Sequence, residues 1–201
     1  MLTSVEQLED IYGKANERSV RKEISFISED YAAFILASPF VMLASAGEDG
    51  LDCSPKGDAT GFVRILDTHT LAIPDRPGNN RIDTLRNLVH DPRVALLFLV
   101  PGVGEMMRVN GRASIADDSE LLASFSVNGK PPRTVILVHV ESVYFHCSKA
   151  VVRSDLWNGE KHVDRSSLPS AGAMLQNVSD ASFDGNAYDR ALPGRLKTDL
   201  Y

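Results

Sequence analysis

The sequence has little of what exported or membrane-spanning proteins need. It contains only two cysteines, Cys53 and Cys147, among its 201 residues, and the N-terminus lacks the basic-then-apolar order of a signal peptide. No apolar run approaches the ~20 residues that cross a bilayer. The longest run near the middle, residues 94–100, has the length of a strand. We therefore expect a cytoplasmic protein that has two reduced thiols and no membrane association.

An excess of basic charge and the common nucleotide- and metal-binding motifs are also missing. The net charge is −6, which disfavours a nucleic-acid partner. Neither Gly-x4-Gly-Lys-Ser/Thr nor Gly-x-Gly-x-x-Gly occurs, so we expect neither a P-loop nor a Rossmann site. The five histidines show no metal-ligand spacing, and the neighbours His146 and Cys147 would point to opposite faces of a strand. We expect no metal site and name no catalytic acid, base or nucleophile.

What the sequence does contain is a series of short strands joined by turns. Strands are predicted over residues 40–44, 51–54, 60–66, 71–73, 93–100, 106–115 and 134–147, with a turn at 47–50. Helices are predicted to begin near Val5, at Ser28 and at Asn79 or Asn80, and shorter ones to cover 120–126 and 171–178. Because hairpin turns, not helices, separate most strands, the pattern favours a mainly β, α+β fold: an antiparallel barrel with flanking helices.

The composition divides the chain into three parts. We expect an N-terminal helical segment at residues 1–30, a barrel domain at 31–157 and a C-terminal tail at 158–201, where Ser, Gly, Pro and Asp become frequent.

The first polar cluster, Cys53-Ser-Pro-Lys-Gly-Asp58, follows a predicted strand. It offers a hydroxyl, an ammonium, a carboxylate and glycine backbone, which together can hold a polar, anionic ligand. A plain polar hairpin turn is the alternative interpretation.

The second cluster, Pro74-Asp-Arg-Pro-Gly-Asn-Asn-Arg81, lies between a strand and a predicted helix. Two arginines and a helix N-terminus meet there, and free N–H groups at a helix start favour a phosphate. The alternative is a surface loop whose arginines form salt bridges.

The third cluster, Arg108-Val-Asn-Gly-Arg112, belongs to a predicted strand. The two-residue period places Arg108, Asn110 and Arg112 on one face, where one of them could reach a ligand. A solvent-facing strand edge is the alternative.

The fourth cluster follows the last strand. Lys149, Arg153 and Trp157 recur every four residues, so they would share one face if the segment were helical. Such a cationic and aromatic face suits a flat, electron-poor ring or an anion, whereas packing of Trp157 in the core is the alternative.

Taken in order, these segments resemble the pyridoxamine 5′-phosphate oxidase-like superfamily of FMN-binding split barrels, and a bacterial subfamily of it more closely than the oxidase itself. The segments are Ser38-Pro-Phe, Ser54-Pro-Lys-Gly-Asp, Gly61-Phe-Val-Arg, Pro74-Asp-Arg-Pro-Gly-Asn-Asn-Arg, Leu97-Phe-Leu-Val-Pro-Gly, Arg108-Val-Asn-Gly-Arg and His146-Cys-Ser-Lys-Ala. They cover roughly Tyr31 to Trp157.

The resemblance implies an antiparallel FMN-binding split β-barrel that forms a homodimer with the flavin at the interface. It assigns phosphate binding to Arg76, Asn79, Asn80 and Arg81, and the lining of the flavin to Ser54, Pro55, Lys56 and Gly57. Ile73 and Pro74 match the strand end beside the ring, and Arg108 matches a polar position at its pyrimidine edge. Lys149, Arg153 and Trp157 would come from the second subunit.

The oxidase itself differs at two places. It carries an Arg-x-Val-Leu-Leu-Lys-type strand where this chain has Asp52-Cys-Ser-Pro-Lys-Gly-Asp, and its C-terminal Arg-x-His motif has no match. Oxidation of vitamin B6 is therefore not expected. The resemblance implies an FMN-dependent oxidoreductase that acts on a small-molecule substrate or takes electrons from a reduced nicotinamide donor. The alternatives are a non-catalytic FMN store or sensor, or a pocket for haem or a deazaflavin.

Overall fold

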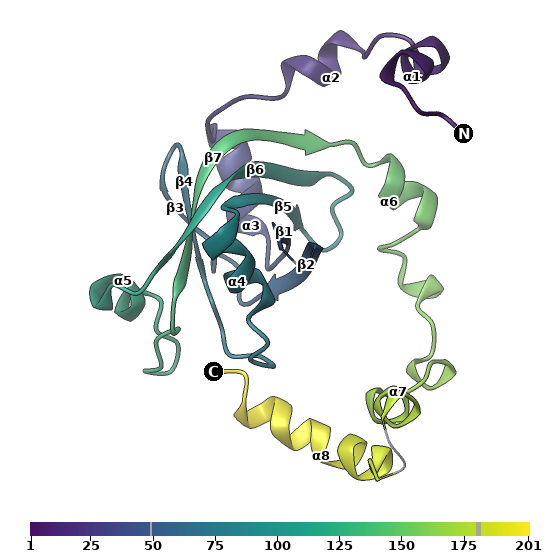
Figure 1. Ribbon diagram of the computed structural model, residues 1–201. Helices are drawn as coiled ribbons and strands as arrows, with labels where there is room; N and C mark the ends of the chain where they lie inside the picture. Colours follow the sequence, from purple (N-terminus) through teal and green to yellow (C-terminus); the bar gives the residue numbers. More distant parts are fainter. Residues whose placement is uncertain (49, 180–181) are drawn as a thin grey trace.

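A computed structural model describes residues 1–48, 50–179 and 182–201 (Figure 1). Its α-helices are α1 (Val5–Tyr12), α2 (Glu17–Arg21), α3 (Glu29–Ala37), α4 (Asp83–His90), α5 (Ser119–Ser124), α6 (Lys149–Ser154), α7 (Ala171–Val178) and α8 (Gly185–Thr198). Its strands are β1 (Phe40–Gly47), β2 (Gly50–Gly57), β3 (Arg64–Asp67), β4 (Thr70–Pro74), β5 (Arg93–Leu99), β6 (Met106–Ala116) and β7 (Val135–His146). Among the described helices, none is long and apolar enough to cross a membrane.

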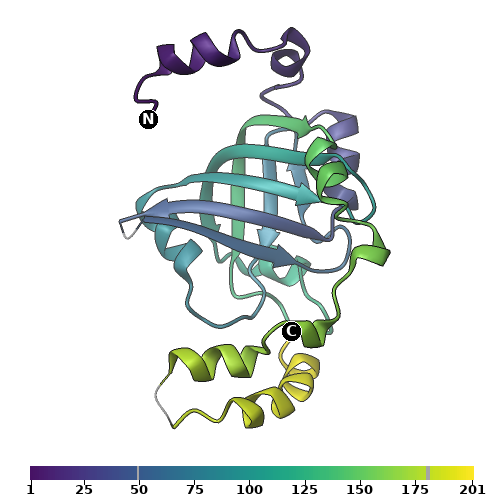
Figure 2. The same ribbon diagram turned by 90° about the vertical axis from the view of Figure 1, so that its right-hand side faces the viewer.

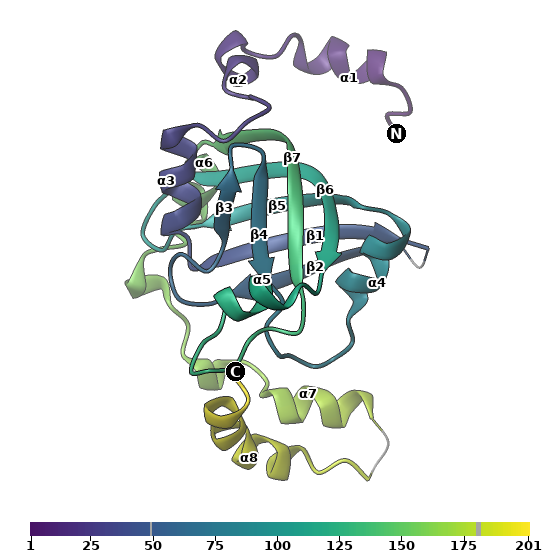
Figure 3. The ribbon, with the colours of Figure 1, turned by 90° about the vertical axis from the view of Figure 1, so that its left-hand side faces the viewer.

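All seven strands form one antiparallel sheet, in the order β2-β1-β5-β6-β7-β4-β3. The sheet folds over on itself, so that β3, β4 and β7 stand in front of β5, β1 and β2 in Figure 3. The predicted antiparallel sheet with flanking helices is thus confirmed. Within the described residues the edge strands β2 and β3 are not paired with each other, so no continuous hydrogen-bonded barrel is formed.

The core lies between the two layers of the folded sheet. Val41 and Leu43 of β1 alternate with partly exposed residues and are fully buried, as expected for a strand with one face toward the core. Leu71 and Ile73 of β4 face them from the other layer and are also fully buried. The opposite face of β1, β5 and β6 points away from this core, and no helix crosses its middle in Figure 2.

The two long strands β6 and β7 belong to both layers, and their pairing is irregular at one place. The register shifts between Asn110 and Gly111, which pair with Ser142 and Val140. Bulges of this kind bend a strand and increase its twist. A Cβ atom added to Gly111 would lie 2.1 Å from the His139 carbonyl oxygen. Only glycine allows the two backbones to approach this closely.

One of the predicted strands, over residues 60–66, begins later in the structure. Residues 60–63 form a turn and a bend in place of the start of a strand, since Gly61 has φ +85° and the Phe62 N–H donates to the Ala59 carbonyl at 3.1 Å. The helix α8 was not predicted, because Pro193 interrupts its sequence pattern. The turn predicted at 47–50 includes residue 49, which lies outside the described residues.

Candidate functional site

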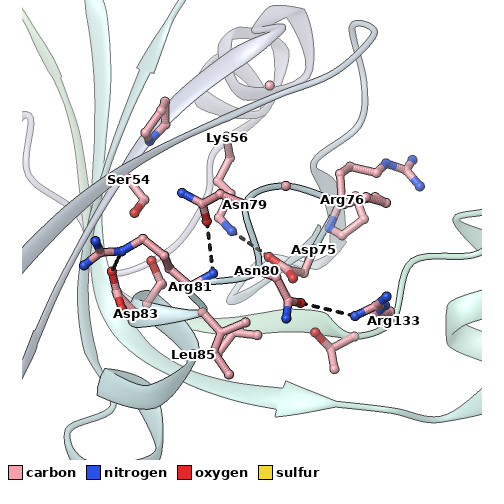
Figure 4. A pocket seen from close by; sticks show the side chains of 18 of the residues that line it. Ser54, Lys56, Asp75, Arg76, Asn79, Asn80, Arg81, Asp83, Leu85 and Arg133 are labelled. Atoms are coloured by element: carbon pink, nitrogen blue, oxygen red, sulfur yellow. Dashed lines mark hydrogen bonds and ion pairs between the residues drawn. The ribbon is translucent and has the colours of Figure 1, made fainter. Parts of the chain in front are cut away.

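A pocket of about 890 Å³ opens between the edge strand β2 and the segment that joins β4 to α4 (Figure 4). Its wall is built from residues 52 and 54–57 of β2, residues 74–82 after β4, the first turn of α4, and residues 133 and 134 before β7. Phe62 completes the lining. Its volume lies in the range that is usual for ligand pockets.

Nine of the residues assigned from the sequence meet in this pocket. They are Ser54, Pro55, Lys56, Gly57, Pro74, Arg76, Asn79, Asn80 and Arg81. Ile73 does not line it, because its side chain is fully buried in the core. Arg108, Lys149, Arg153 and Trp157 do not line it either.

On β2 the polar side chains face the pocket because the strand alternates. Asp52, Ser54 and Lys56 are half-buried, whereas the residues between them are exposed. The Lys56 ammonium lies 2.6 Å from Asp75, and both side chains are mostly buried, at 18% and 20% exposure. The segment is therefore a strand with its side chains in fixed positions, and the interpretation as a hairpin turn is wrong.

Asp52 connects β2 to the first turn of α4. Its Oδ2 accepts hydrogen bonds from the Ser54 hydroxyl at 2.9 Å and from the Thr84 hydroxyl at 2.8 Å. Thr84 belongs to the first turn of α4 and is buried. These two bonds fix the start of α4 against β2, so that the helix N-terminus opens toward the pocket.

Arg76 contributes its backbone to the wall, but its guanidinium points away from the pocket (Figure 4). It donates from Nε to Asp58 at 2.6 Å and from Nη1 to the Phe125 carbonyl at 2.9 Å. The Tyr201 hydroxyl donates to the same carboxylate at 2.6 Å. Burial alone would raise the pKa of Asp58, but hydrogen bonds from Tyr201, the Ala59 N–H and Arg76 together hold it below its ordinary value. Arg76 is thus held in an internal ion pair.

Arg81 lies at the mouth of the pocket and is much more exposed. Its Nε donates to Asp83 at 2.7 Å, with the arginine side chain 72% exposed. The Arg81 backbone N–H donates to the Asn79 side-chain oxygen at 3.0 Å. Exposed ion pairs contribute little free energy, so the guanidinium can exchange Asp83 for a ligand. In this chain, both arginines of the second cluster form salt bridges.

The start of α4 is strained and has no side-chain cap. Asn80 and Ile82 have φ angles of +60° and +55°, which a β-branched residue rarely adopts. Ile82 is the N-cap residue, and no side chain accepts a bond from the first turn of the helix. The predicted cap by Asn79 or Asn80 is wrong, because Asn79 accepts from Arg81 instead. The N–H groups of this first turn are left for an external acceptor.

Arg133 and Thr134 also line the pocket, and the sequence patterns did not indicate them. Arg133 donates to the Asn80 side-chain oxygen at 3.3 Å and forms no ion pair within the described residues. The Thr134 hydroxyl is buried and, among the described residues, has no hydrogen-bond partner. Both residues follow Pro131 and Pro132, which predict a loop. The only signal in the sequence that could have indicated them is the positive charge of Arg133 directly before a strand.

The remaining predicted residues lie on other elements. Lys149 and Arg153 belong to α6 and are exposed. The helix ends at Ser154, because Asp155 turns into the left-handed conformation with φ +55°. Trp157 therefore does not share their face; its indole N–H donates to the Val103 carbonyl at 2.8 Å, and it is 37% exposed. The alternative of a core tryptophan is wrong as well.

The pocket is lined by charged side chains of both signs. The cationic side chains of Lys56, Arg81 and Arg133 and three carboxylates line it, whereas the guanidinium of Arg76 points away. None of the described lining residues is His, Cys or Tyr. Across the described part of the chain, no three His, Cys, Asp or Glu side chains gather in a way that could hold a metal ion. Cys53 and Cys147 are exposed and unpaired.

One comparison with known proteins identifies the family. The sequence pattern of the pyridoxamine 5′-phosphate oxidase family matches residues 27–147. No curated protein matches the sequence.

Several solved structures share part of the fold. HupZ from Group A Streptococcus is 18% identical, over 58% of this chain and 91% of that one, with a TM-score of 0.48. A proposed pyridoxamine 5′-phosphate oxidase from Lactobacillus delbrueckii is 21% identical, over 60% and 95%, with a TM-score of 0.46. An FAD-binding protein from Mycobacterium smegmatis is 11% identical, over 61% and 97%, with a TM-score of 0.43. These scores are too low to add to the family match.

Proposed function

The chain belongs to the pyridoxamine 5′-phosphate oxidase family, and from this premise we propose that it is an FMN-dependent oxidoreductase. The observation that supports this most is the gathering of β2, the 74–82 segment and the start of α4 around one pocket. Families of this kind include flavin oxidoreductases, and the pocket offers what a phosphorylated flavin needs.

The residues at the start of α4 fit a phosphate. The helix N-terminus has no side-chain cap, and backbone N–H groups together with the helix dipole favour an anion there. Arg81 and Arg133 are the exposed cations beside it. Asn79 and Asn80 add amide groups on the same segment. We propose that these four residues hold the FMN phosphate, with Arg76 supporting the segment through Asp58 and not by direct contact.

The β2 wall fits the remainder of the flavin. Ser54, Lys56 and Gly57 present a hydroxyl, an ammonium and a backbone free of side chain. The Thr134 hydroxyl, buried and unpartnered among the described residues, is a further donor that a bound polar group would satisfy. FMN supplies the redox chemistry when bound, and the chain's residues position it and exclude water.

We propose that the functional form is a homodimer. The face of the sheet that no helix covers is largely apolar at its centre, where Met42 of β1 lies beside Pro55 and Leu97. Arg108 lies three strands from β2 on the same face, roughly 14 Å away at ordinary strand spacing. Arg108, and likewise Lys149, Arg153 and Trp157, would reach a flavin only in the partner's pocket.

Light scattering on the FMN-loaded protein is expected to give twice the chain mass of 22.0 kDa. Leu97→Glu should produce monomers, because it places a charge in the centre of the apolar face. Leu66→Glu is the matched control, since Leu66 is already 49% exposed on the edge strand β3. A monomeric wild-type protein that still binds FMN tightly would contradict the interface.

The activity is tested by identifying the bound molecule and then reducing it. The purified protein is expected to show a flavin absorption spectrum and to release FMN, identified by its mass. Anaerobic NADH or NADPH should bleach the flavin, and an added acceptor should restore the colour with repeated turnover. Binding without reduction would favour a flavin store or sensor. A haem or deazaflavin spectrum would contradict the assignment of FMN as the cofactor.

A further inference from the structure

The C-terminal tail, residues 158–201, contacts the barrel close to the proposed flavin pocket. Its helices α7 and α8 pack on each other below the sheet in Figure 3, and the chain comes back to the barrel at Tyr201. The two helices are joined by bonds of their own, since Asp189 of α8 accepts a hydrogen bond from the Gly172 N–H at 2.8 Å. The tail is thus a helical unit with its own contacts, and Tyr201 connects it to the barrel.

Three contacts fix the position of Tyr201. Its hydroxyl donates to Asp58 at 2.6 Å, and its ring centre lies 5.5 Å from the Arg76 guanidinium carbon. The Lys130 ammonium donates to the main-chain oxygen of Tyr201 at 2.8 Å. The hydrogen bond to Asp58 raises the pKa of Tyr201, so the phenol keeps its proton and remains a donor.

The carboxylate that receives Tyr201 joins the two walls of the pocket. Asp58 directly follows the last residue of β2, and Arg76 belongs to residues 74–82, which we name the pocket segment. The side chains of the two residues form an ion pair at 4% and 15% exposure. A buried charge is stable only while its partners are in place. Loss of the Tyr201 hydroxyl would therefore loosen the ion pair that connects β2 to the pocket segment.

The pocket segment needs such support because its backbone is strained. Asn80 and Ile82 have positive φ angles, and a conformation of this kind persists only where the surrounding structure holds it. The helix that follows is fixed by the bond from Thr84 to Asp52 at 2.8 Å. At the other end, Arg76 is the residue whose side chain anchors the segment, through the bonds already described.

We propose that Tyr201 is a positioning residue of the flavin pocket. Through Asp58 and Arg76 it holds the pocket segment in the shape that receives the FMN phosphate, so docking of the tail sets the affinity for the cofactor. This inference rests on the proposed function, because FMN is the ligand that the segment receives. The coupling is reciprocal, and bound FMN should stabilise the docked tail by the same factor.

Tyr201→Phe tests the role of the hydroxyl, because it keeps a ring beside Arg76 and removes only the donor to Asp58. FMN affinity should fall about three- to tenfold, as is usual for a residue that acts through others. Riboflavin lacks the phosphate that the pocket segment holds, so its affinity should stay almost equal to that of the wild type. A merely structural role would weaken both ligands alike. Fluorescence titration of the full-length protein measures both affinities.

Hydrogen exchange of the full-length protein without ligand, followed by mass spectrometry, measures the pocket segment directly. Tyr201→Phe should speed exchange in that segment, because its anchor opens more often. Lys130→Met is the second variant, since it releases the Tyr201 main chain and leaves the buried ion pair unaltered. Tyr188→Phe is the matched control: it removes the same hydroxyl from α8, where the Tyr188 ring lies 5.8 Å from that of Phe183.

The outcomes separate this inference from the flavin proposal. If Tyr201→Phe and Lys130→Met both leave exchange in the pocket segment unchanged, or if Tyr188→Phe has the same effect as Tyr201→Phe, the inference is refuted, whether or not FMN binds. If Tyr201→Phe weakens riboflavin as much as FMN, or weakens neither, it also fails. If the protein binds no flavin, the flavin proposal fails, and faster exchange that depends on Tyr201 still upholds its positioning of the segment.

Discussion

Arg81→Ala is expected to weaken FMN binding about 10- to 100-fold, because a charge-assisted hydrogen bond typically contributes about 1.5–3 kcal/mol. Arg81 is an exposed cation that directly precedes Ile82, the N-cap residue of α4, and its only ion-pair partner in the described residues is Asp83. Riboflavin has no phosphate, so its affinity should be almost equal in the variant and the wild type. Fluorescence titration with both ligands measures the difference.

Arg86→Ala is the control for this experiment. Arg86 lies on the same helix and is exposed, but it does not line the pocket. Removing it changes the net charge by the same amount and should leave FMN affinity within a factor of about two, as for an exposed charge. An Arg81→Ala variant that loses riboflavin as strongly as FMN would show that the residue acts on the pocket's shape or on the ring.

Gly111→Ala is expected to destabilise the fold by about 3 kcal/mol or more, in the upper range for overpacking. The added Cβ would meet the His139 carbonyl oxygen at 2.1 Å, and both atoms belong to backbone in paired strands. His139 is also held from the other side by its pairing with Thr70 of β4. Since β7 cannot move away without losing that pairing, the melting temperature should fall by roughly 10 °C.

Gly159→Ala is the matched substitution. A Cβ at Gly159 meets nothing within 4 Å, and the residue has no positive φ. Its thermal unfolding should lie within roughly 2 °C of the wild type, as for a surface substitution. Equal melting temperatures for both variants would mean that β6 and β7 are farther apart at the bulge than the structure has them.

Much of the candidate site could be predicted because its parts are contiguous in sequence. Ser54, Lys56 and Gly57 follow one another on a strand, and Asn79 to Arg81 precede a helix. Strand alternation and helix starts are local properties, so residue order alone indicates which side chains share a face. The resemblance to a family added the expectation that these two segments meet at one cofactor.

The sequence could not show which charged side chains of the site form ion pairs with one another. Arg76 and Arg81 are equivalent in the sequence pattern, yet one is bound to Asp58 and the other stands exposed at the mouth. Arg133 lies far along the chain from Asn80, and the two meet only because the start of β7 comes beside the β4–α4 segment. Pairs of this kind are set by the path of the backbone, not by spacing along it.

By itself, the sequence determined the class of the fold and the positions of most strands and helices, because these follow from the local periodicity of apolar residues. It also indicated the two polar segments, whose meeting at one pocket was implied by the family resemblance. Only the tertiary structure decided that Ile82 begins α4 without a cap, that Trp157 leaves the helix of Lys149 and Arg153, and that Arg133 meets Asn80 beside the pocket. These features depend on left-handed residues and on contacts between distant segments. Each is a balance of packing and hydrogen bonding over the whole domain, which no local pattern specifies.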